Sequence, residues 1–163
     1  MTSVARNDGP SAAPPTLLYL MKQVELAIRA RLDELMRPAG LTALQYTALT
    51  VLERHPDLTS ARLARHSFVT AQTMSDMVTA LRGRGLIERH QDPSDRRRLV
   101  LALTADGHEL LDKYRPPVAA LEAEMLSGLT ANEAGRLRQA ILACREALAA
   151  GAAPVTPDDR RVS

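Results

Sequence analysis

The chain has 163 residues, of which 45% are hydrophobic and 25% charged, and this length and balance suit one globular domain. Only 2% of the residues are aromatic, so the core is expected to be aliphatic. The one cysteine, Cys144, excludes an internal disulfide and a cysteine-rich zinc site. The apolar runs fall short of the about eighteen residues that span a bilayer, and the N-terminus lacks the apolar segment of a secretory signal. We therefore expect a cytoplasmic protein with no membrane partner.

The basic residues are concentrated in the middle of the chain. Residues 59–98 carry eight arginines against four acidic side chains, which gives this segment a net charge of +4 (eight minus four). Residues 1–58 are balanced, and residues 99–163 carry seven basic against nine acidic side chains. This asymmetry favours a negatively charged partner, of which nucleic acid is the commonest large one. A solvated arginine-rich surface is the alternative.

Both ends of the chain, residues 1–15 and 151–163, are rich in Pro, Ala and Ser and are expected to be disordered tails around a domain at 16–150. A first helix begins at Leu17 and is ended by Pro38 and Gly40. Its apolar surface is broad enough to suggest two buried faces. The apolar positions are Leu17, Leu20, Met21, Val24, Ala27, Ile28, Leu32 and Leu35.

Three shorter helices follow, each with a threonine or serine before its first residue. Thr42 and Gln45 form the capping box of the second helix, and Thr59 or Ser60 caps a short third one. Thr70 caps the fourth helix, which runs from residue 71 to about 84. On the fourth helix, Met74, Met77, Val78 and Leu81 form an apolar side, and Gln72, Thr73, Asp76 and Thr79 form a short, polar one.

A β-hairpin follows the fourth helix. Residues 86–90 and 99–103 are expected to form two antiparallel strands, because leucines alternate with Val100 and Ala102 in the second of them. Leu99, Leu101 and Leu103 should point to one side of the hairpin, and Val100 and Ala102 to the other. The turn-rich segment between the strands, "QDPSDRRR", places three consecutive arginines at the tip.

Two long helices complete the chain. Thr104 caps the first of them, and Pro116 and Pro117 are expected to bend or split it. Thr130 and Glu133 form the capping box of the last helix. The apolar stripe of this last helix consists of Ala134, Leu137, Ile141, Cys144 and Leu148.

Two helices joined by a short connection and followed at once by a hairpin predict a winged helix-turn-helix. In this arrangement the second helix of the pair enters the major groove of double-stranded DNA, where Gln72 is suited to adenine. The hairpin is the wing, and its arginines can enter the narrow, negative minor groove beside that helix.

The run over residues 63–107, and above all "DPSDRRRLVLALTADG", resembles the multiple antibiotic resistance regulator (MarR) family of bacterial transcription factors. The resemblance implies a mainly α fold with a small β-hairpin wing: a winged helix-turn-helix lobe at about 42–104, with N- and C-terminal dimerisation helices at about 16–37 and 105–149. It also implies an obligate homodimer that binds a palindromic operator. We expect a repressor, with an activator as the alternative, because promoter geometry, which the chain does not encode, decides between them. Release from DNA is expected to follow binding of a small-molecule effector or oxidation.

The resemblance also assigns roles to the wing residues. Arg97 matches the wing-tip arginine that enters the minor groove, and Asp95 matches the acidic residue that holds it in position. Arg96 and Arg98 are expected to face phosphate or solvent.

Thr70, Gln72, Thr73 and Ser75 match the DNA-contacting start of the recognition helix. Asp76 departs from the family pattern, because many relatives have a basic residue there. An acid at this position loses a phosphate contact but could accept a hydrogen bond from a cytosine amino group, so the base preference is open.

The other candidate sites are weaker. Cys144 could be a thiol sensor, but its place on an apolar stripe favours a packing or dimer-interface role, since burial disfavours the thiolate. The four histidines lack the spacing of a metal site, so no metal and no cofactor are expected.

No catalytic motif is present, and we do not expect an enzyme. A small helical enzyme and a winged-helix module that binds protein remain as alternatives. An effector pocket is expected between the first, second and fifth helices, with Tyr19, Tyr46 and Tyr114 as the few aromatic candidates.

Overall fold

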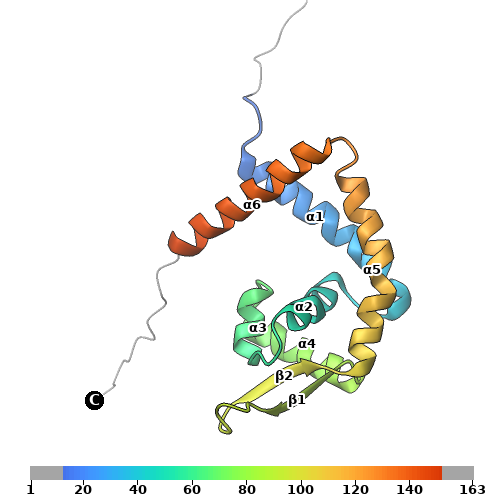
Figure 1. The fold of residues 1–163 in the computed structure, drawn as a ribbon, viewed down its shortest axis with the longest axis vertical. Coiled ribbons are helices and arrows are strands. Elements are labelled where there is room, and N and C mark those ends of the chain that lie inside the picture. The colour runs from blue at the N-terminus through green and yellow to red at the C-terminus, as the bar shows by residue number, and fades with distance from the viewer. Residues whose placement is uncertain (1–12, 152–163) are drawn as a thin grey trace, which may run out of the picture. The chain divides into compact units, whose positions relative to one another are not determined.

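The computed structural model describes residues 13–151 (Figure 1). The two predicted tails lie outside the described residues, apart from residues 13–15, which precede the first helix, and Gly151, which ends the last one. The predicted order of four helices, a hairpin and two helices is confirmed, with one short 3-10 turn added. The elements are α1 (Leu17–Met36), η1 (Arg37–Ala39), α2 (Ala43–Arg54), α3 (Ser60–His66), α4 (Ala71–Gly83), β1 (Ile87–Gln91), β2 (Leu99–Leu103), α5 (Ala105–Met125) and α6 (Ala131–Gly151). They form two compact units, which divide after Val118.

The helix caps follow the sequence closely. Thr42 accepts a hydrogen bond from the backbone N–H of Gln45 at 3.1 Å, and the Gln45 side chain accepts from the Thr42 N–H at 3.0 Å, which completes the capping box. Thr59, and not Ser60, caps α3. Because a side-chain oxygen at each cap satisfies a backbone N–H that has no partner within its helix, these threonines fix where the helices begin.

The core of the first unit lies between α2, α3, α4 and the hairpin. The four apolar residues of α4 are all buried, with exposed fractions between 0% for Met74 and 7% for Met77. They pack in one cluster with residues of α2, α3 and α5 such as Leu49, Leu63 and Leu111. The core of the described residues is mainly aliphatic, as the composition predicted, and also includes Tyr46 and Tyr114.

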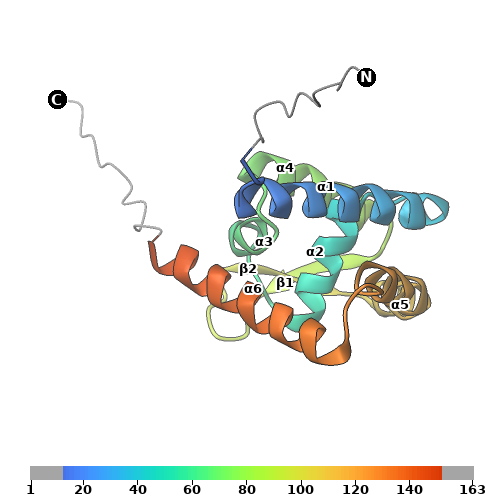
Figure 2. The same ribbon diagram turned by 90° about the horizontal axis from the view of Figure 1, so that it is seen from above.

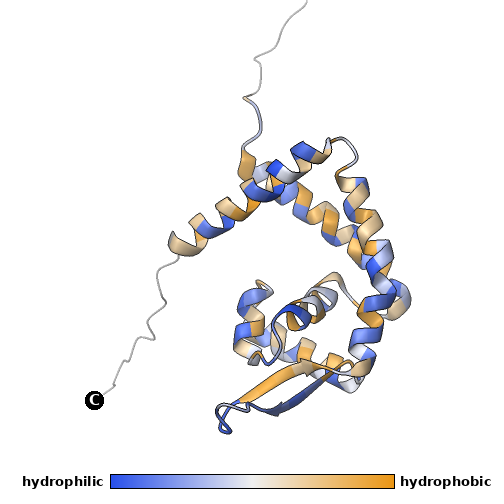
Figure 3. Cartoon of the chain, in the orientation of Figure 1, coloured by the Kyte–Doolittle hydropathy of each residue, from blue (hydrophilic) through white to orange (hydrophobic). Residues whose placement is uncertain are grey.

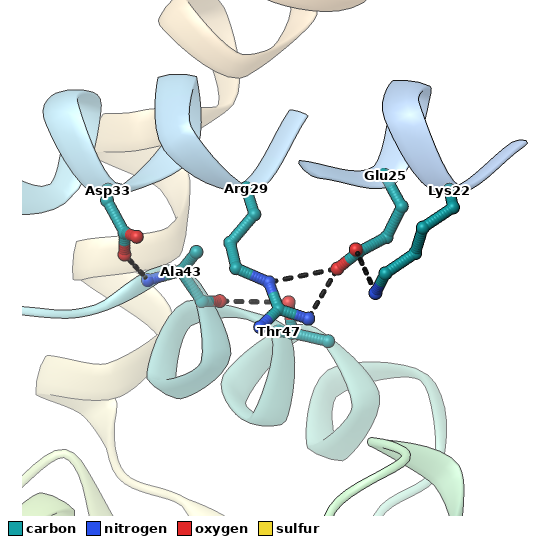
Figure 4. A network of polar contacts seen from close by, with 6 residues as sticks. All are labelled: Lys22, Glu25, Arg29, Asp33, Ala43 and Thr47. Atoms are coloured by element: carbon teal, nitrogen blue, oxygen red, sulfur yellow. Dashed lines mark hydrogen bonds and ion pairs between the residues drawn. The ribbon is translucent and has the colours of Figure 1, made fainter. Parts of the chain in front are cut away.

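The first helix is attached to the lobe by its C-terminal half. An oxygen of the Asp33 carboxylate accepts a hydrogen bond from the Ala43 N–H at 2.6 Å, so that α1 satisfies a backbone donor at the start of α2 (Figure 4). Figure 2 shows α1 and α2 from above; the two helices are in contact. Toward the N-terminal end of α1, Glu25 pairs with Lys22 and Arg29 on the same helix. These two cations lower the pKa of the Glu25 carboxyl.

The second buried face expected for α1 is not formed within the single chain, and its burial in a dimer stays a prediction. Met36, at the C-terminal end, is its one buried residue, and Leu32 and Leu35 are partly covered. Apolar side chains of the N-terminal half stand in solvent. Their exposed fractions run from 39% to 81% and belong to Leu17, Leu18, Tyr19, Leu20, Met21, Val24 and Leu26. The periodicity identified the apolar surface correctly, but in one chain α1 has packing partners only near its C-terminal end.

The hairpin pairs β1 and β2 in antiparallel register from Ile87 opposite Leu103 to Gln91 opposite Leu99. Figure 3 shows β2 as apolar and the tip of the hairpin as hydrophilic. Burial in β2 does not follow the alternation of its side chains, because Val100 and Leu101 are both buried whereas Leu99 is 52% exposed. Leu99 lies on the same face as Leu101 but two residues nearer the tip, and it does not belong to the core cluster.

Helix α5 begins at a tight junction with the hairpin. The Thr104 hydroxyl donates to the Gly85 carbonyl at 2.6 Å and accepts from the Gly107 N–H at 3.1 Å. A Cβ on Gly107 would lie 2.2 Å from the carbonyl oxygen of Leu86, so only glycine fits here. This junction fixes the hairpin at the base of α5.

The expectation that Pro116 and Pro117 could split α5 is wrong. The helix continues from Ala105 to Met125 with both prolines inside it. Each proline removes one N–H from the hydrogen-bond ladder, and the peptides on both sides keep the helical course. The boundary between the two compact units nevertheless falls directly after this pair, at Val118.

Candidate nucleic-acid interface

The exposed face of α4 carries most of the residues predicted to contact DNA. Gln72, Ser75 and Asp76 are exposed, and Thr73 is half-buried near the start of the helix. Since the opposite face of α4 is locked into the core, these short polar side chains are presented on a helix that is held in place. A helix of this width fits the major groove, and amide, hydroxyl and carboxylate groups can form hydrogen bonds with base edges.

The two threonines at the start of α4 contact each other. Thr70 accepts a hydrogen bond from the Thr73 N–H at 3.1 Å and donates to the Thr73 hydroxyl at 2.9 Å. In this cap the Thr70 hydroxyl both accepts and donates a hydrogen bond, and one lone pair of the Thr73 hydroxyl is occupied. The Thr73 hydroxyl keeps its hydrogen for a phosphate or a base.

Gln72 and Asp76 lie one helical turn apart and are joined. The Gln72 Nε2 donates to the Asp76 Oδ1 at 3.2 Å. Sequence reasoning considered these two residues separately, although the spacing of four residues is the signal that could have paired them.

The tip of the wing is organised by two aspartates. Asp95 accepts from the Arg97 N–H at 3.1 Å, and the same carboxylate oxygen lies 3.7 Å from the Arg97 Nε. Asp95 therefore contacts Arg97 as the resemblance implies, while the Arg97 side chain is 95% exposed. The Arg98 N–H donates to the Asp95 carbonyl at 2.9 Å, which closes the turn. The tip thus presents exposed guanidinium groups on a hydrogen-bonded turn.

Asp92 is a wing residue whose role the sequence reading missed. Its carboxylate accepts from the Ser94 hydroxyl at 2.7 Å and from the Ser94 N–H at 2.9 Å. These two donors hold the pKa of the Asp92 carboxyl below its ordinary value. The signal was available in the "DPS" segment, because Asp two residues before a polar residue in a turn commonly bonds the backbone in this way.

The base of the wing is tied to the loop between α2 and α3. Leu58 pairs with Leu101 as an isolated bridge, and the Leu101 N–H donates to the Leu58 carbonyl at 2.8 Å. Beside it, Asp57 has a left-handed backbone with φ of 62° and contacts the His90 Nε2 at 2.9 Å. The hairpin thus gains an isolated bridge to Leu58 that the local pattern did not reveal.

Further exposed groups lie beside α4 within the same unit. Arg62 and Arg65 are exposed on α3, the first helix of the pair. Phe68, in the turn between α3 and α4, is 90% exposed and has a left-handed backbone with φ of 55°. Sequence reasoning did not single out these three residues, although the arginines belong to the segment of net charge +4.

A pocket of the described residues lies against η1, the end of α4 and the start of α5. Its lining consists of Pro38, Ala39, Arg84, Leu86, Asp106, Glu109, Leu110, Lys113 and Tyr114. Tyr46 is instead a core residue whose burial raises the pKa of its hydroxyl, and Tyr19 is 57% exposed. The effector pocket expected between the first, second and fifth helices stays a prediction.

Cys144 is exposed in the single chain, so within one chain it does not pack, and the expected dimer-interface role stays a prediction. The reason is that the described side chains of α6 include no buried one. Within the described residues, no group of three or more His, Cys, Asp or Glu side chains could hold a metal ion. None of the helices described is long and apolar enough to cross a membrane.

Comparison with known proteins identifies the family. The sequence model described as MarR family matches residues 39–98. The HTH-type transcriptional repressor Rv2887 of Mycobacterium tuberculosis is 35% identical over 113 residues, which cover 69% of this chain and 81% of the relative. Its structure in complex with salicylic acid matches with a TM-score of 0.68 at 31% identity over 82% of this chain and 99% of that one. The Staphylococcus aureus MepR–DNA complex, at 23% identity and a TM-score of 0.70 over 82% and 99%, has the same fold. With its capped recognition helix, ordered wing and these relatives, the chain belongs to the MarR family of winged helix-turn-helix transcription regulators.

Proposed function

We propose that this chain is a ligand-responsive transcriptional repressor that binds a palindromic operator in double-stranded DNA as a homodimer. The observation that carries the proposal is the pairing of two features in one compact unit: a helix, α4, that is buried on one face and polar on the other, and a wing whose tip exposes arginines. The relatives named as repressors, Rv2887 and the Pseudomonas putida protein NicR, support the regulatory role.

In this proposal α4 lies in the major groove. Gln72 reads a base edge, and Ser75 and Thr73 donate to bases or phosphates from the exposed face. Thr70 keeps the first turn in place and turns the N–H groups of the helix start toward the phosphates. Asp76 is the one acid on this face.

The wing takes the minor groove beside α4. Arg97 enters it, because its side chain is 95% exposed and its backbone is held by Asp95. A narrow minor groove concentrates negative potential, which attracts an inserted guanidinium. Arg96 contacts a phosphate, and Arg98 faces phosphate or solvent.

The dimer is formed by the terminal helices. We propose one domain at residues 16–150, with the DNA-binding lobe at about 42–104 and the dimerisation helices at about 16–37 and 105–149. The exposed apolar side chains of α1 and of α6 support this assignment. A two-fold dimer places two copies of α4 on two half-sites, which explains the expected palindrome.

A small molecule controls release from DNA. The relative Rv2887 has been solved with salicylic acid and with p-aminosalicylic acid, so a small aromatic carboxylate is the first effector class to test here. In this role the protein acts in the cytoplasm, where bacterial DNA lies. The role requires no cofactor or metal and involves no catalysed reaction.

A mobility-shift titration tests the proposed function. The full-length chain is mixed with duplex DNA from its own upstream region, at several salt concentrations and with an excess of unrelated DNA. A band that survives the competitor and weakens with rising salt supports an operator-binding regulator, because phosphate contacts release counterions. A band abolished equally by the competitor would overturn sequence-specific binding. Addition of salicylate then tests the effector class.

A further inference from the structure

Gln72 and Asp76 form a connected pair on the DNA-facing side of α4. The Gln72 Nε2 donates to the Asp76 Oδ1 at 3.2 Å, and both side chains are exposed. Two hydroxyls of this helix serve the helix itself: Thr79 donates to the Ser75 carbonyl at 3.0 Å, and Thr70, the cap, donates to the Thr73 hydroxyl. The Gln72 amide, by contrast, is held by the carboxylate of Asp76.

The carboxylate decides which way the amide of Gln72 points. An ionised carboxylate only accepts hydrogen bonds, whereas a glutamine amide has a donor end, Nε2, and an acceptor end, Oε1. If the amide were rotated by half a turn, Oε1 would face Asp76 and two acceptors would repel each other. Asp76 thus holds Nε2 toward itself and turns Oε1 away from itself.

In this orientation the Gln72 amide can form two hydrogen bonds with one base, adenine. Nε2 carries two hydrogens, and one of them forms the hydrogen bond to Asp76. The other N–H and the free Oε1 remain as an adjacent donor and acceptor. Adenine presents the complementary pair in the major groove, with N7 as acceptor and the N6 amino group as donor. Guanine presents two acceptors at the same edge, so the fixed Oε1 has no donor to meet.

We infer that Asp76 is a positioning residue that presets the Gln72 amide to read adenine, and that it does not itself read a cytosine. The inference rests on the proposed function, because it concerns how the DNA-binding helix chooses a base. It assigns a reason for an acid on this face: a carboxylate lowers affinity for every duplex by repelling phosphate, and in exchange it fixes the side chain that distinguishes one sequence from another.

The test begins with an operator selected by the full-length wild-type chain from random duplexes. The base pair most affected by Gln72→Ala is then varied through all four possibilities. Gln72→Ala is expected to lower the preference for adenine at this pair by about five- to 150-fold. Asp76→Ala is expected to lower the same preference by about two- to ten-fold, because an amide free to rotate must be ordered on binding. Asp76→Ala should also bind every duplex more tightly, since a negative charge is lost.

Two further variants separate positioning from direct reading. Asp76→Asn keeps the size of the side chain, but its amide can accept from Nε2 or donate to Oε1, so it should lose adenine preference as Asp76→Ala does and still bind every duplex more tightly. In the Gln72→Ala background, Asp76→Ala should cause no further loss of preference at any base pair. If that double variant loses preference at a second pair, where cytosine is selected, Asp76 reads the base itself and the inference is wrong.

Replacing the selected adenine by 7-deazaadenine gives an independent measurement. This base lacks the N7 acceptor, so wild-type binding should weaken, while Asp76→Ala should lose less. An Asp76→Ala variant that is folded by its thermal transition and keeps the full adenine preference would overturn the inference alone. A wild-type chain that selects no sequence at all would overturn the proposed function, and the inference with it.

Discussion

Helices α4 and α6 have similar sequence patterns and different surroundings. Each has a cap at its N-terminus and an apolar stripe along one side. The stripe of α4 is buried, with Leu81 at 0% and Met77 at 7% exposed, whereas on α6 Leu137 is 39% and Ile141 43% exposed. A helical period thus identifies which face of a helix is apolar, but it does not identify what covers that face. In the single chain the apolar face of α4 is covered and that of α6 is not.

The largest expected effect comes from removing the uncovered stripe. A chain that ends at Gly128 lacks α6 and should lose the dimer, because it lacks one of the two apolar surfaces proposed to form it. Two linked half-site contacts gain about 10² to 10⁴ in affinity over one, so operator binding should fall by a factor in that range. Light scattering and a mobility-shift titration measure the two losses. A full-length chain that is monomeric at micromolar concentration would contradict this explanation of α6.

A matched pair of leucine truncations measures the same contrast within the intact chain. Leu81→Ala leaves a cavity in a closed core and should lower the free energy of unfolding by about 2–5 kcal/mol. Leu137→Ala removes the same atoms from a side chain that is 39% exposed, so within one chain it should cost far less. Its effect should instead appear as weaker dimerisation. Denaturant unfolding at two protein concentrations separates the two, and equal losses for both variants would contradict the comparison.

The third prediction contrasts the wing with α4. Arg97→Ala should weaken binding to operator and to random duplex alike, and lower the salt slope by roughly one unit per arginine removed, or two if both subunits engage. Gln72→Ala should instead cost about 1–3 kcal/mol on the operator with little change on random DNA. Titrations at several salt concentrations decide between these patterns.

Arg136→Ala is the charge-matched control for Arg97→Ala. Arg136 is exposed on α6, outside its apolar stripe and away from α4 and the wing in sequence, so its loss should leave the salt slope unchanged. If Arg97→Ala behaves like this control, or if Gln72→Ala weakens both duplexes equally, the division of roles between wing and helix is wrong.

Most of the fold was accessible from the sequence because it is set by local rules. A cap and its donor are three residues apart, as in Thr42 and Gln45, and a hairpin brings neighbouring segments together. The family resemblance then assigned the wing residues, and Asp95 does lie against Arg97. The DNA contacts assigned to these residues stay predictions.

The missed features depend on partners distant in the chain or on competing local effects. Leu58 bonds to Leu101 across three intervening elements, and no local pattern marks such a bridge. Whether Cys144 is covered depends on what packs on α6, and the apolar stripe of α6 does not identify that partner. The contact of Gln72 with Asp76 is different, because a spacing of four residues on a helix could have predicted it.

The caps of the two helices should respond differently to acid. The Glu133 carboxylate of α6 accepts from the Thr130 N–H at 2.8 Å and from its hydroxyl, and these donors lower its pKa below the ordinary value of 4.5. A carboxyl with a lowered pKa stabilises the fold above pH 4.5, and this contribution is lost as the pH falls further. The cap of α4, made by Thr70 and Thr73, has no group that titrates there.

Amide hydrogen exchange between pH 3 and 6, corrected for the intrinsic rate, measures the stability of each helix. Protection in the first turn of α6 should fall below pH 4.5, while protection in α4 should stay level until the whole lobe unfolds. Glu133→Gln keeps the capping box without a titrating group and should remove the pH dependence of the α6 turn. The same pH dependence in this variant would contradict the assignment to Glu133.

The smallest expected effect is at Cys144, and it tests what covers the α6 stripe. Cys144 is exposed in one chain, so exposure alone would allow oxidation. If a second copy covers the stripe, the thiol is enclosed among apolar side chains, where the thiolate is disfavoured and reaction is slow. Cys144→Ser should then leave operator affinity, and release by an effector or by peroxide, nearly unchanged. The decisive measurement is a mobility shift with and without peroxide: if peroxide frees the wild-type chain from DNA and leaves Cys144→Ser bound, the stripe is open to solvent in the dimer and Cys144 is a sensor.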